Sequence, residues 1–153
     1  MNAISLRDAT LDDLEWLYAL HRAAMKSYVE QTWGWEEQWQ VQYFRQHFDA
    51  STRQVIQHNG QDIGFIDVEE RENHMLLANI EILPSYQRRG IGTFLIQDLL
   101  GKAAIRGLYV SLQVLKVSPA KALYERLGFE LTGETDTHYL MKRVQPGDRR
   151  DSR

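Results

Sequence analysis

The sequence predicts a mixed α/β fold, built as one domain over residues 1–144 and followed by a charged, disordered tail at 145–153. Three observations lead to this prediction. Apolar residues recur at helical spacing from Leu14 to His21, an Asn59-Gly60 pair marks a hairpin, and a strand, a glycine loop and a helix follow one another from Ile80 onward. The expected order of elements is β-α-α-β-β-β-α-β-α-β-β.

The first half of the chain is expected to hold a strand, two helices and a hairpin. The segment Thr10-Leu11-Asp12-Asp13 resembles a capping box, which satisfies backbone N–H groups at a helix start. Asn59-Gly60 provides the positive φ angles that a two-residue hairpin turn requires. In order, the elements are the strand Ser5–Arg7, a helix from Thr10, a helix over Glu36–Phe48, and the strands Arg53–Gln57 and Ile63–Glu69.

The second half is expected to alternate strands with helices and to close with a second hairpin. Gly128 is the residue type that usually follows a helix C-terminus, so the last helix should end just before it. In order, the elements are the strand Met75–Leu83, the helix Gly92–Arg106, the strand Leu108–Leu115, the helix Pro119–Leu127, and the strands Phe129–Glu134 and His138–Arg143.

Composition narrows the classes of protein to which the chain can belong. Its 153 residues are 43% hydrophobic and 25% charged, which is ordinary for a globular protein. Cysteine is absent, which excludes disulfides, thiolate metal sites and a cysteine nucleophile. A net charge of −3 argues against nucleic-acid binding, and no apolar run reaches the ~20 residues that span a membrane. The N-terminus lacks the layout of a signal peptide, so we expect a cytoplasmic protein without nucleic-acid or membrane partners.

The most informative segment is residues 80–93, IEILPSYQRRGIGT. A strand followed by a glycine loop and a helix start directs several backbone N–H groups to one point, where the helix dipole favours an anion such as phosphate. The chain has no Walker loop. Its Gly101-Lys102 pair is followed by Ala103, where a Walker loop needs Ser or Thr. The segment is not a dinucleotide fingerprint either, because Leu95 occupies the place of the third glycine. A turn that merely starts a helix is the structural alternative.

The QRRGIG run of Gln87–Gly92 closely resembles the Q/R-x-x-G-x-G/A signature of the GNAT N-acetyltransferase superfamily. A second segment, Val114–Phe129, resembles the family's other diagnostic block, a strand followed by N-x-x-A-x-x-L-Y-E-x-x-G-F, and its A-x-x-L-Y-E-R-L-G-F part matches residue for residue. The resemblance extends from Ile4 to about Arg143. It implies the GNAT acyl-CoA N-acyltransferase fold, in which the fourth and fifth strands splay apart and acetyl-CoA lies in the resulting cleft, and it implies no metal.

By this resemblance, the loop backbone would hold the pyrophosphate of acetyl-CoA. The backbones of two residues at the end of the preceding strand would pair with the pantetheine arm, and one N–H there would stabilise negative charge on the thioester oxygen. The sequence departs from the family at one position, where Val117 replaces an asparagine and Ser118 is the nearest polar residue. The residues expected to bind the coenzyme are Ile82, Leu83, Gln87, Arg88, Arg89, Gly90, Ile91, Gly92, Thr93, Ser118 and Ala120.

Two residues are the candidate catalytic groups. Tyr124 falls on the tyrosine of the family's L-Y-E motif, which acts as general acid, and a phenol of pKa ~10 can protonate a thiolate whose acid has pKa ~8.5. The alternative is a core tyrosine on an amphipathic helix. Glu81, between apolar neighbours, is the candidate base that takes the amine's proton directly or through water, and His138 is the alternative base.

The acceptor amine is expected to bind near the first two helices, which the family uses for this purpose together with the late hairpin. The segment Tyr28–Trp39 places aromatic faces beside carboxylates, a combination that suits a cationic amine. The expected substrate contacts are Trp33, Glu36 and Glu37. Trp39 has aromatic residues four positions away on both sides, and this spacing favours burial as part of a packed helix stripe.

Together these features predict an acetyl-CoA-dependent N-acetyltransferase. Transfer to a primary amine would be direct, since no cysteine is present to form an acyl-enzyme. A small-molecule amine is favoured over a protein acceptor. Two alternatives stay open: a CoA-binding sensor or interaction module with little catalysis, and an acetyltransferase for protein N-termini or lysines. An exposed late strand could pair between subunits of a homodimer.

Overall fold

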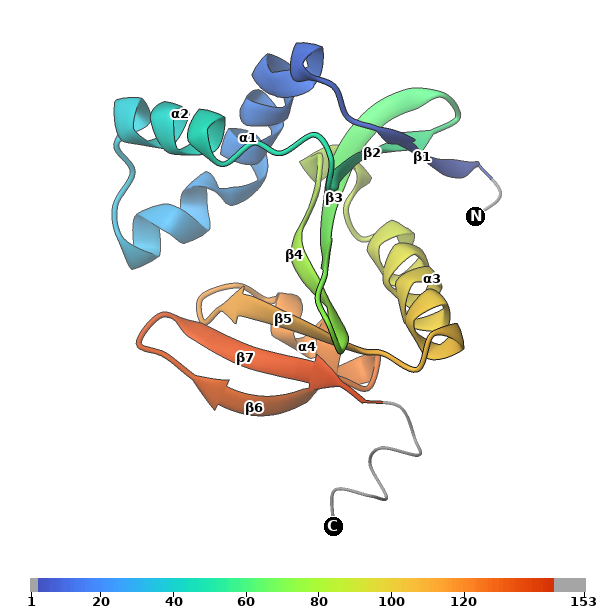
Figure 1. Ribbon diagram of the computed structural model, residues 1–153. Helices are drawn as coiled ribbons and strands as arrows, with labels where there is room; N and C mark the ends of the chain where they lie inside the picture. Colours follow the sequence, from blue (N-terminus) through green and yellow to red (C-terminus); the bar gives the residue numbers. More distant parts are fainter. Residues whose placement is uncertain (1–2, 145–153) are drawn as a thin grey trace. The chain divides into compact units, whose positions relative to one another are not determined.

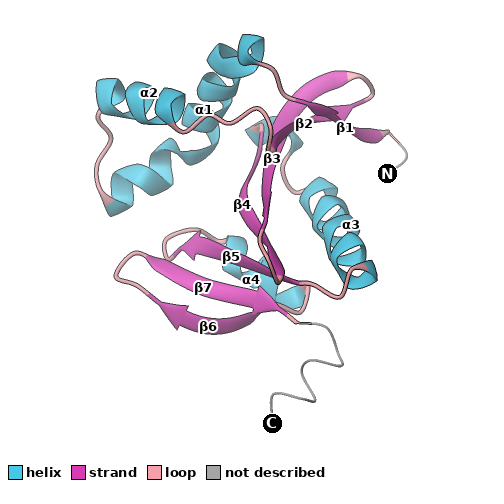
Figure 2. Cartoon of the chain, viewed as in Figure 1, coloured by secondary structure: helices cyan, strands magenta, loops and turns pink. Residues whose placement is uncertain are grey.

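The computed structural model describes residues 3–144, so the tail predicted at 145–153 lies outside the described residues. The strands are β1 (Ile4–Asp8), β2 (Arg53–His58), β3 (Gln61–Glu70), β4 (His74–Ile82), β5 (Tyr109–Leu115), β6 (Glu130–Glu134) and β7 (His138–Arg143). The helices are α1 (Leu14–Thr32), α2 (Glu37–Gln46), α3 (Ile91–Ile105) and α4 (Ala120–Arg126), with short 3₁₀ turns η1 (Leu11–Asp13) and η2 (Pro84–Tyr86). The predicted order of elements is confirmed (Figures 1 and 2).

The strands hydrogen-bond in the order β1-β2-β3-β4-β5-β7-β6, which makes a mixed sheet because β4 and β5 run parallel. Their pairing runs from His74 opposite Tyr109 to Leu77 opposite Leu112, although β4 continues for five more residues. The chain divides into two compact units. The first unit is residues 3–67 with Asn79–Gly92, and the second unit is Val68–Ala78 with residues 93–144.

The first unit begins with three antiparallel strands. Strand β1 pairs with β2, and β2 pairs with β3 through the predicted hairpin. Asn59 and Gly60 at the turn have φ angles of 52° and 82°, as a type I′ turn requires of both central residues. The hairpin is therefore set by local turn chemistry that can be read from two residues.

The helices of the first unit start and pack as the sequence indicates. The backbone N–H of Thr10 donates to the Asp13 carboxylate at 2.8 Å, which is the carboxylate half of the predicted capping box. Leu17 and Leu20 of α1 form a buried cluster with Phe44 of α2 and Phe65 of β3. This cluster joins both helices to the sheet of the unit.

Strands β3 and β4 approach each other closely at Gly64. A Cβ atom at this position would lie 2.3 Å from the carbonyl oxygen of Glu81 and 3.1 Å from the Cα of Ile82. No L-residue side chain fits there without displacement of the backbone. Gly64 therefore determines how near the C-terminal end of β4 lies to β3.

The second unit contains the parallel β4–β5 pairing, and β5 also pairs antiparallel with β7, which pairs with β6. Helix α4 ends before Gly128, whose φ of 92° confirms the predicted helix-terminating position. Across residues 3–144, no helix is long and apolar enough to cross a membrane.

Candidate active site

The loop between β4 and α3 has the shape that an anion site requires. Arg88 and Gly90 have φ angles of 62° and 82°, so the chain turns sharply before α3 begins at Ile91. Among the described turn and loop hydrogen bonds, none uses the backbone N–H of Arg88, Arg89 or Gly90. The first N–H groups of any α-helix also lack partners inside the helix. A run of N–H groups is therefore available where the helix dipole favours negative charge.

Side-chain contacts hold this loop in place. The amide of Gln87 donates to the carbonyl of Ile82 at 2.8 Å, which closes the loop onto the end of β4. The Arg89 guanidinium lies 4.9 Å from the centre of the Tyr86 ring, and the Tyr86 hydroxyl donates to Gln61 at 3.1 Å. Two cationic side chains thus accompany the backbone N–H groups, and one of them is positioned by an aromatic ring. These residues fit the diphosphate of a coenzyme.

One of the two residues expected to pair with the pantetheine arm, Leu83, is hydrogen-bonded through its main chain within the protein. The N–H of Leu83 donates to the carbonyl of Ile63 at 2.8 Å, and the carbonyl of Leu83 accepts the N–H of Tyr86 at 2.8 Å. Pairing with β3 thus occupies the N–H of Leu83, whereas its carbonyl oxygen, with two lone pairs, can still accept a second hydrogen bond. Because neighbouring residues of a strand direct their N–H groups to opposite edges, the N–H of Ile82 is the group left for a ligand.

Glu81 is buried at the end of β4, where His21 of α1 contacts its carboxylate. The Nδ1 atom of His21 lies 2.9 Å and 3.1 Å from the two carboxylate oxygens of Glu81. Side-chain exposure is 17% for His21 and 4% for Glu81. Among the described residues, no other group donates to the Glu81 carboxylate.

The sequence places His21 on the apolar face of the first helix and does not predict it as a candidate site residue. A histidine on the buried face of an amphipathic helix signals a polar partner inside the unit, since buried polar groups require hydrogen bonds. The signal did not identify the partner, because Glu81 is 60 residues away in the sequence.

Aromatic rings surround the His21–Glu81 pair. The centre of the His21 ring lies 5.2 Å from that of Phe44, 6.2 Å from that of Trp35 and 6.4 Å from that of Tyr18. These rings come from α1, α2 and the segment between them. They shield the pair on several sides and strengthen electrostatic interactions within it.

Glu37, a predicted substrate contact, serves as a junction between α1 and α2. Its carboxylate accepts hydrogen bonds from the Tyr18 hydroxyl, from Arg22 Nε at 2.8 Å and from Trp35 Nε1 at 3.1 Å. These bonds, with that from Tyr18 the largest cause, lower the pKa of Glu37 to about 2. An amine would have to compete with three donors for this carboxylate.

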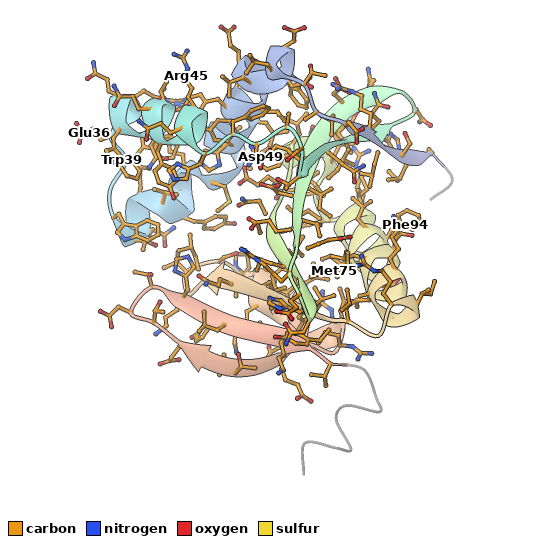
Figure 3. All side chains as sticks on the ribbon, in the orientation of Figure 1. Glu36, Trp39, Arg45, Asp49, Met75 and Phe94 are labelled. Carbon is orange, nitrogen blue, oxygen red and sulfur yellow. The ribbon has the colours of Figure 1, made fainter. Side chains whose placement is uncertain are left out.

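The other two predicted substrate contacts lie at the surface near the same junction. Trp33 ends α1 and is 60% exposed, and Glu36 precedes α2 and is exposed (Figure 3 labels Glu36). Both side chains are therefore accessible to an acceptor, whereas Glu37 is engaged within the protein.

The interpretation of Trp39 as a buried residue is wrong. Trp39, labelled in Figure 3, is 55% exposed. It stacks on Tyr43 with ring centres 4.9 Å apart, and Tyr43 in turn stacks on His47 at 3.9 Å. The buried face of α2 is instead formed by Gln40 and Phe44. A four-residue aromatic repeat identifies one face of a helix, but the repeat does not say whether that face meets the core.

Tyr124 is buried in α4 of the second unit. Its ring packs edge-on against Phe129 with centres 5.7 Å apart, and burial raises the pKa of Tyr124 to about 12. No described residue hydrogen-bonds its hydroxyl. Tyr124 therefore stays protonated at neutral pH, as a proton donor must.

Two further predicted residues lie near the start of α4. The Ser118 hydroxyl oxygen accepts the N–H of Ala120 at 3.2 Å, which leaves the hydroxyl hydrogen available to a ligand.

His138, the alternative base, lies at the start of β7. Its Nδ1 atom is 2.8 Å from the Thr137 hydroxyl, and burial lowers the pKa of His138.

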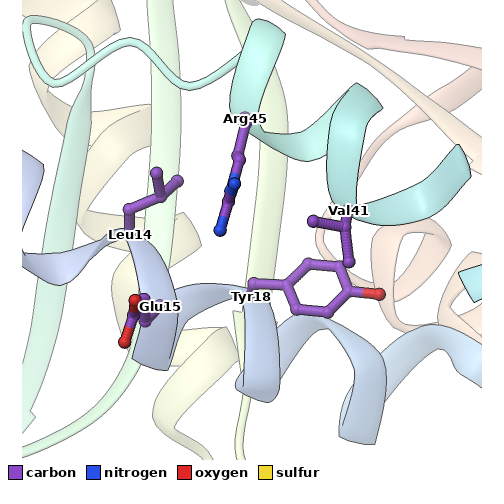
Figure 4. A pocket seen from close by; sticks show the side chains of 5 residues that line it. All are labelled: Leu14, Glu15, Tyr18, Val41 and Arg45. Carbon is purple, nitrogen blue, oxygen red and sulfur yellow. The ribbon is translucent and has the colours of Figure 1, made fainter. Parts of the chain in front are cut away.

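Two hollows in the described part of the chain lie apart from the predicted site residues. One of about 160 Å³ lies between α1 and α2, where Arg45 extends toward α1 between Leu14 and Tyr18 (Figure 4). Another of about 230 Å³ lies over strands β4 to β7 of the second unit. Pockets for drug-sized ligands are usually about 300–1,000 Å³, so neither hollow is large enough to hold a coenzyme. Among residues 3–144, no cluster of three or more His, Asp or Glu side chains could hold a metal ion.

Comparison with known proteins identifies relatives of this chain and of its fold. Residues 45–131, more than half of the chain, match the family model described as acetyltransferase (GNAT) domain. The [ribosomal protein bS18]-alanine N-acetyltransferase of Haemophilus influenzae is 36% identical over 72 residues, which are 46% of this chain and 49% of that enzyme. The chain thus spans about half the length of the curated relative that it matches.

Two solved structures share the fold. The PaiA N-acetyltransferase of Thermoplasma acidophilum, in complex with coenzyme A, has a TM-score of 0.76 at 18% identity, over 93% of this chain and 99% of that chain. The ribosomal-protein-S18-alanine N-acetyltransferase of Escherichia coli has a TM-score of 0.68 at 22% identity, over 95% of this chain and 97% of that chain. These likenesses confirm the predicted fold class.

Proposed function

Because the chain belongs to the GNAT acetyltransferase family, we propose that it is an N-acetyltransferase that moves the acetyl group of acetyl-CoA directly to a primary amine. The observation that best supports this proposal is the loop of Arg88 to Gly90, with its two left-handed residues and its unengaged N–H groups. The chain holds no cysteine, so the proposed transfer proceeds without a cysteinyl intermediate.

Coenzyme binding is assigned to both ends of this loop. The backbone of Gln87 to Thr93 binds the diphosphate, and Arg88 and Arg89 add charge. The N–H of Ile82 stabilises the negative charge that develops on the thioester oxygen. Ser118 contributes its hydroxyl as a donor, and Ala120 orients that hydroxyl through its backbone N–H.

The proton transfers are divided between two groups. Tyr124 donates its proton to the thiolate that leaves when the C–S bond breaks, and it regains a proton from the acetylated nitrogen. The proton of the acceptor ammonium is removed by the pair of His21 and Glu81. At pH 7, neutralising a lysine-like amine of pKa ~10.4 costs roughly 4–5 kcal/mol, whereas an α-amine of pKa ~7.8 costs roughly 1 kcal/mol.

The acceptor is assigned to the surface around Trp33 and Glu36. A tryptophan face beside a carboxylate suits a cationic small-molecule amine, which is our first candidate acceptor. A second candidate is the α-amine of a protein. The observation that favours it is the likeness to an enzyme named for the alanine of a ribosomal protein.

The function is tested by calorimetric titration with acetyl-CoA, followed by a thiol-release screen. The screen covers polyamines, amino acids, aminoglycosides and peptides with a free N-terminal alanine, each with an N-blocked peptide as control. Binding with thiol release on one class of amine would establish the enzyme and its acceptor class. Tight binding without release on any amine would favour a CoA-binding sensor, and an absence of binding would contradict the assignment of the loop.

A further inference from the structure

On the premise that the proposed function is correct, we propose that His21 is the general base of the reaction and that Glu81 is its positioning partner. The sequence alone favours Glu81 as the base. The structure assigns this role to the other member of the pair, because of the hydrogen bonds and the side-chain exposure of the two residues.

Hydrogen bonding determines which nitrogen of His21 is basic. An ionised carboxylate only accepts hydrogen bonds, so the Nδ1 atom that faces both oxygens of Glu81 carries the hydrogen. The lone pair of the neutral ring then lies on Nε2. Among the described residues, none hydrogen-bonds Nε2. Glu81 therefore fixes the tautomer and orientation of His21, as the carboxylate does in a serine-histidine-aspartate triad.

Exposure also favours His21 over Glu81. The imidazole retains 17% of its exposure and Glu81 retains 4%, so an arriving amine reaches the ring before it reaches the carboxylate. Glu81 directly precedes Ile82, whose N–H we assign to the thioester oxygen. Leu83, the residue after Ile82, packs against the buried cluster that contains Leu17 and Leu20 of α1. His21 and the end of β4 thus share one packed neighbourhood of the first unit.

The other charged groups around His21 are already paired with one another. Arg22 and Tyr18 of α1 bond to Glu37 at the start of α2. Beyond Phe44, the guanidinium of Arg53 pairs with Asp67 at 2.9 Å. Glu81 is the charged group in hydrogen-bond contact with His21.

The proposed step moves one proton. The N–H bond of the acceptor ammonium breaks, its electron pair stays on nitrogen as the attacking lone pair, and the proton binds Nε2 of His21. The imidazolium is then paired with the Glu81 carboxylate and passes its proton to water. Histidine suits this role because its ordinary titration range lies between pH 5 and 8.

The first test needs no activity. A long-range ¹H–¹⁵N NMR spectrum of the full chain reports the tautomer of each of its five histidines, and His21→Gln identifies the His21 signals. We expect the Nδ1–H tautomer at His21 in the wild-type protein and a change of its signals in Glu81→Gln. His47→Gln, at the exposed end of α2, is the control and should leave them unchanged. The Nε2–H tautomer at His21 would overturn the proposal.

The second test is the pH–rate profile of acetyl transfer, measured with the best amine of the screen. We expect His21→Gln to lower kcat by roughly 100-fold and to remove the acidic limb. Glu81→Gln should lower kcat less than His21→Gln does and should keep the limb, because the ring remains but loses the carboxylate that orients it. The KM for acetyl-CoA should stay within about twofold in both variants.

Three results would contradict the proposal. A limb that survives in His21→Gln and disappears in Glu81→Gln would make Glu81 the base. A limb that neither variant alters would remove both residues from the proton transfer. If the wild-type protein binds acetyl-CoA but transfers no acetyl group, the proposed function fails together with the base, whereas the NMR result would still stand. Thermal melts of each variant separate these outcomes from misfolding.

Discussion

Replacement of Gly64 by alanine tests how the end of β4 is positioned. The added Cβ would lie 2.3 Å from the carbonyl oxygen of Glu81, whereas real Cβ contacts are essentially never shorter than 3.0 Å. The two strands must therefore separate by about 0.7 Å at this point, the difference between these two distances. Overpacking of this kind typically costs about 1–3 kcal/mol, and the obstacle here is backbone, which cannot rotate away.

In Gly64→Ala, the stability lost by overpacking should exceed the stability gained because alanine restricts the unfolded chain. A glycine-to-alanine change restricts the unfolded chain and by itself stabilises a protein by about 0.4–1 kcal/mol. For a chain of this size, 1 kcal/mol shifts Tm by about 2–4 °C, so the net loss should lower Tm by several degrees. Gly101→Ala is the matched control, because Gly101 lies within α3 and an added Cβ meets nothing within 4 Å. It should raise Tm slightly.

Differential scanning calorimetry measures both variants, and thiol release measures their activity. Gly64→Ala should also lower acetyl transfer more than its stability explains at 25 °C, because the displaced strand carries Glu81 and Ile82. A Tm for Gly64→Ala that equals or exceeds that of Gly101→Ala would refute the close approach of β3 and β4.

The remaining predictions concern three side chains. Tyr124→Phe should lower turnover at least ~10-fold, with acetyl-CoA affinity and Tm nearly unchanged, because the buried hydroxyl has no partner among the described residues; unchanged turnover would remove its role as acid. Trp33→Ala should broaden amine selectivity in the thiol-release screen while calorimetry shows intact coenzyme binding, and unaltered selectivity would place the acceptor elsewhere. Asp13→Asn should destabilise the protein by about 2 kcal/mol at pH 7, because the hydrogen bond from Arg7, the largest cause, holds the pKa of Asp13 well below its ordinary value. That contribution is present above about pH 4 and is lost as the pH falls further, so the wild-type and variant melting temperatures should converge in acid, and a constant gap would contradict it.

The loop and the last helix were predictable because their signals are local. Gly90 and Gly128 have the left-handed φ angles that glycine permits at little cost, and Asn59-Gly60 forms the hairpin that its sequence indicates. In each case, neighbouring residues along the chain decide the conformation. The order of strands and helices followed from these signals together with apolar periodicity.

Side-chain partners and exposure were not predictable in the same way. Periodicity placed Trp39 on one face of α2, but packing of the neighbouring Phe44 turned that face outward. Glu37 appeared in the sequence as a free carboxylate, yet donors from α1 and from Trp35 engage it. The N–H of Leu83 pairs with Ile63 of β3, a partner that is 20 residues away in the sequence.

By itself, the sequence determined the family, the order of elements and the sharp turn of the glycine loop before α3, because each depends on residues that are close together in the chain. The tertiary structure alone decided that His21 meets Glu81 across 60 residues and that Gly64 brings β3 against the end of β4. Helical and strand periods specify which side of an element a residue occupies. Only packing specifies which side chain a residue meets there. In this protein, the contact between His21 and Glu81 is what makes His21 the candidate base.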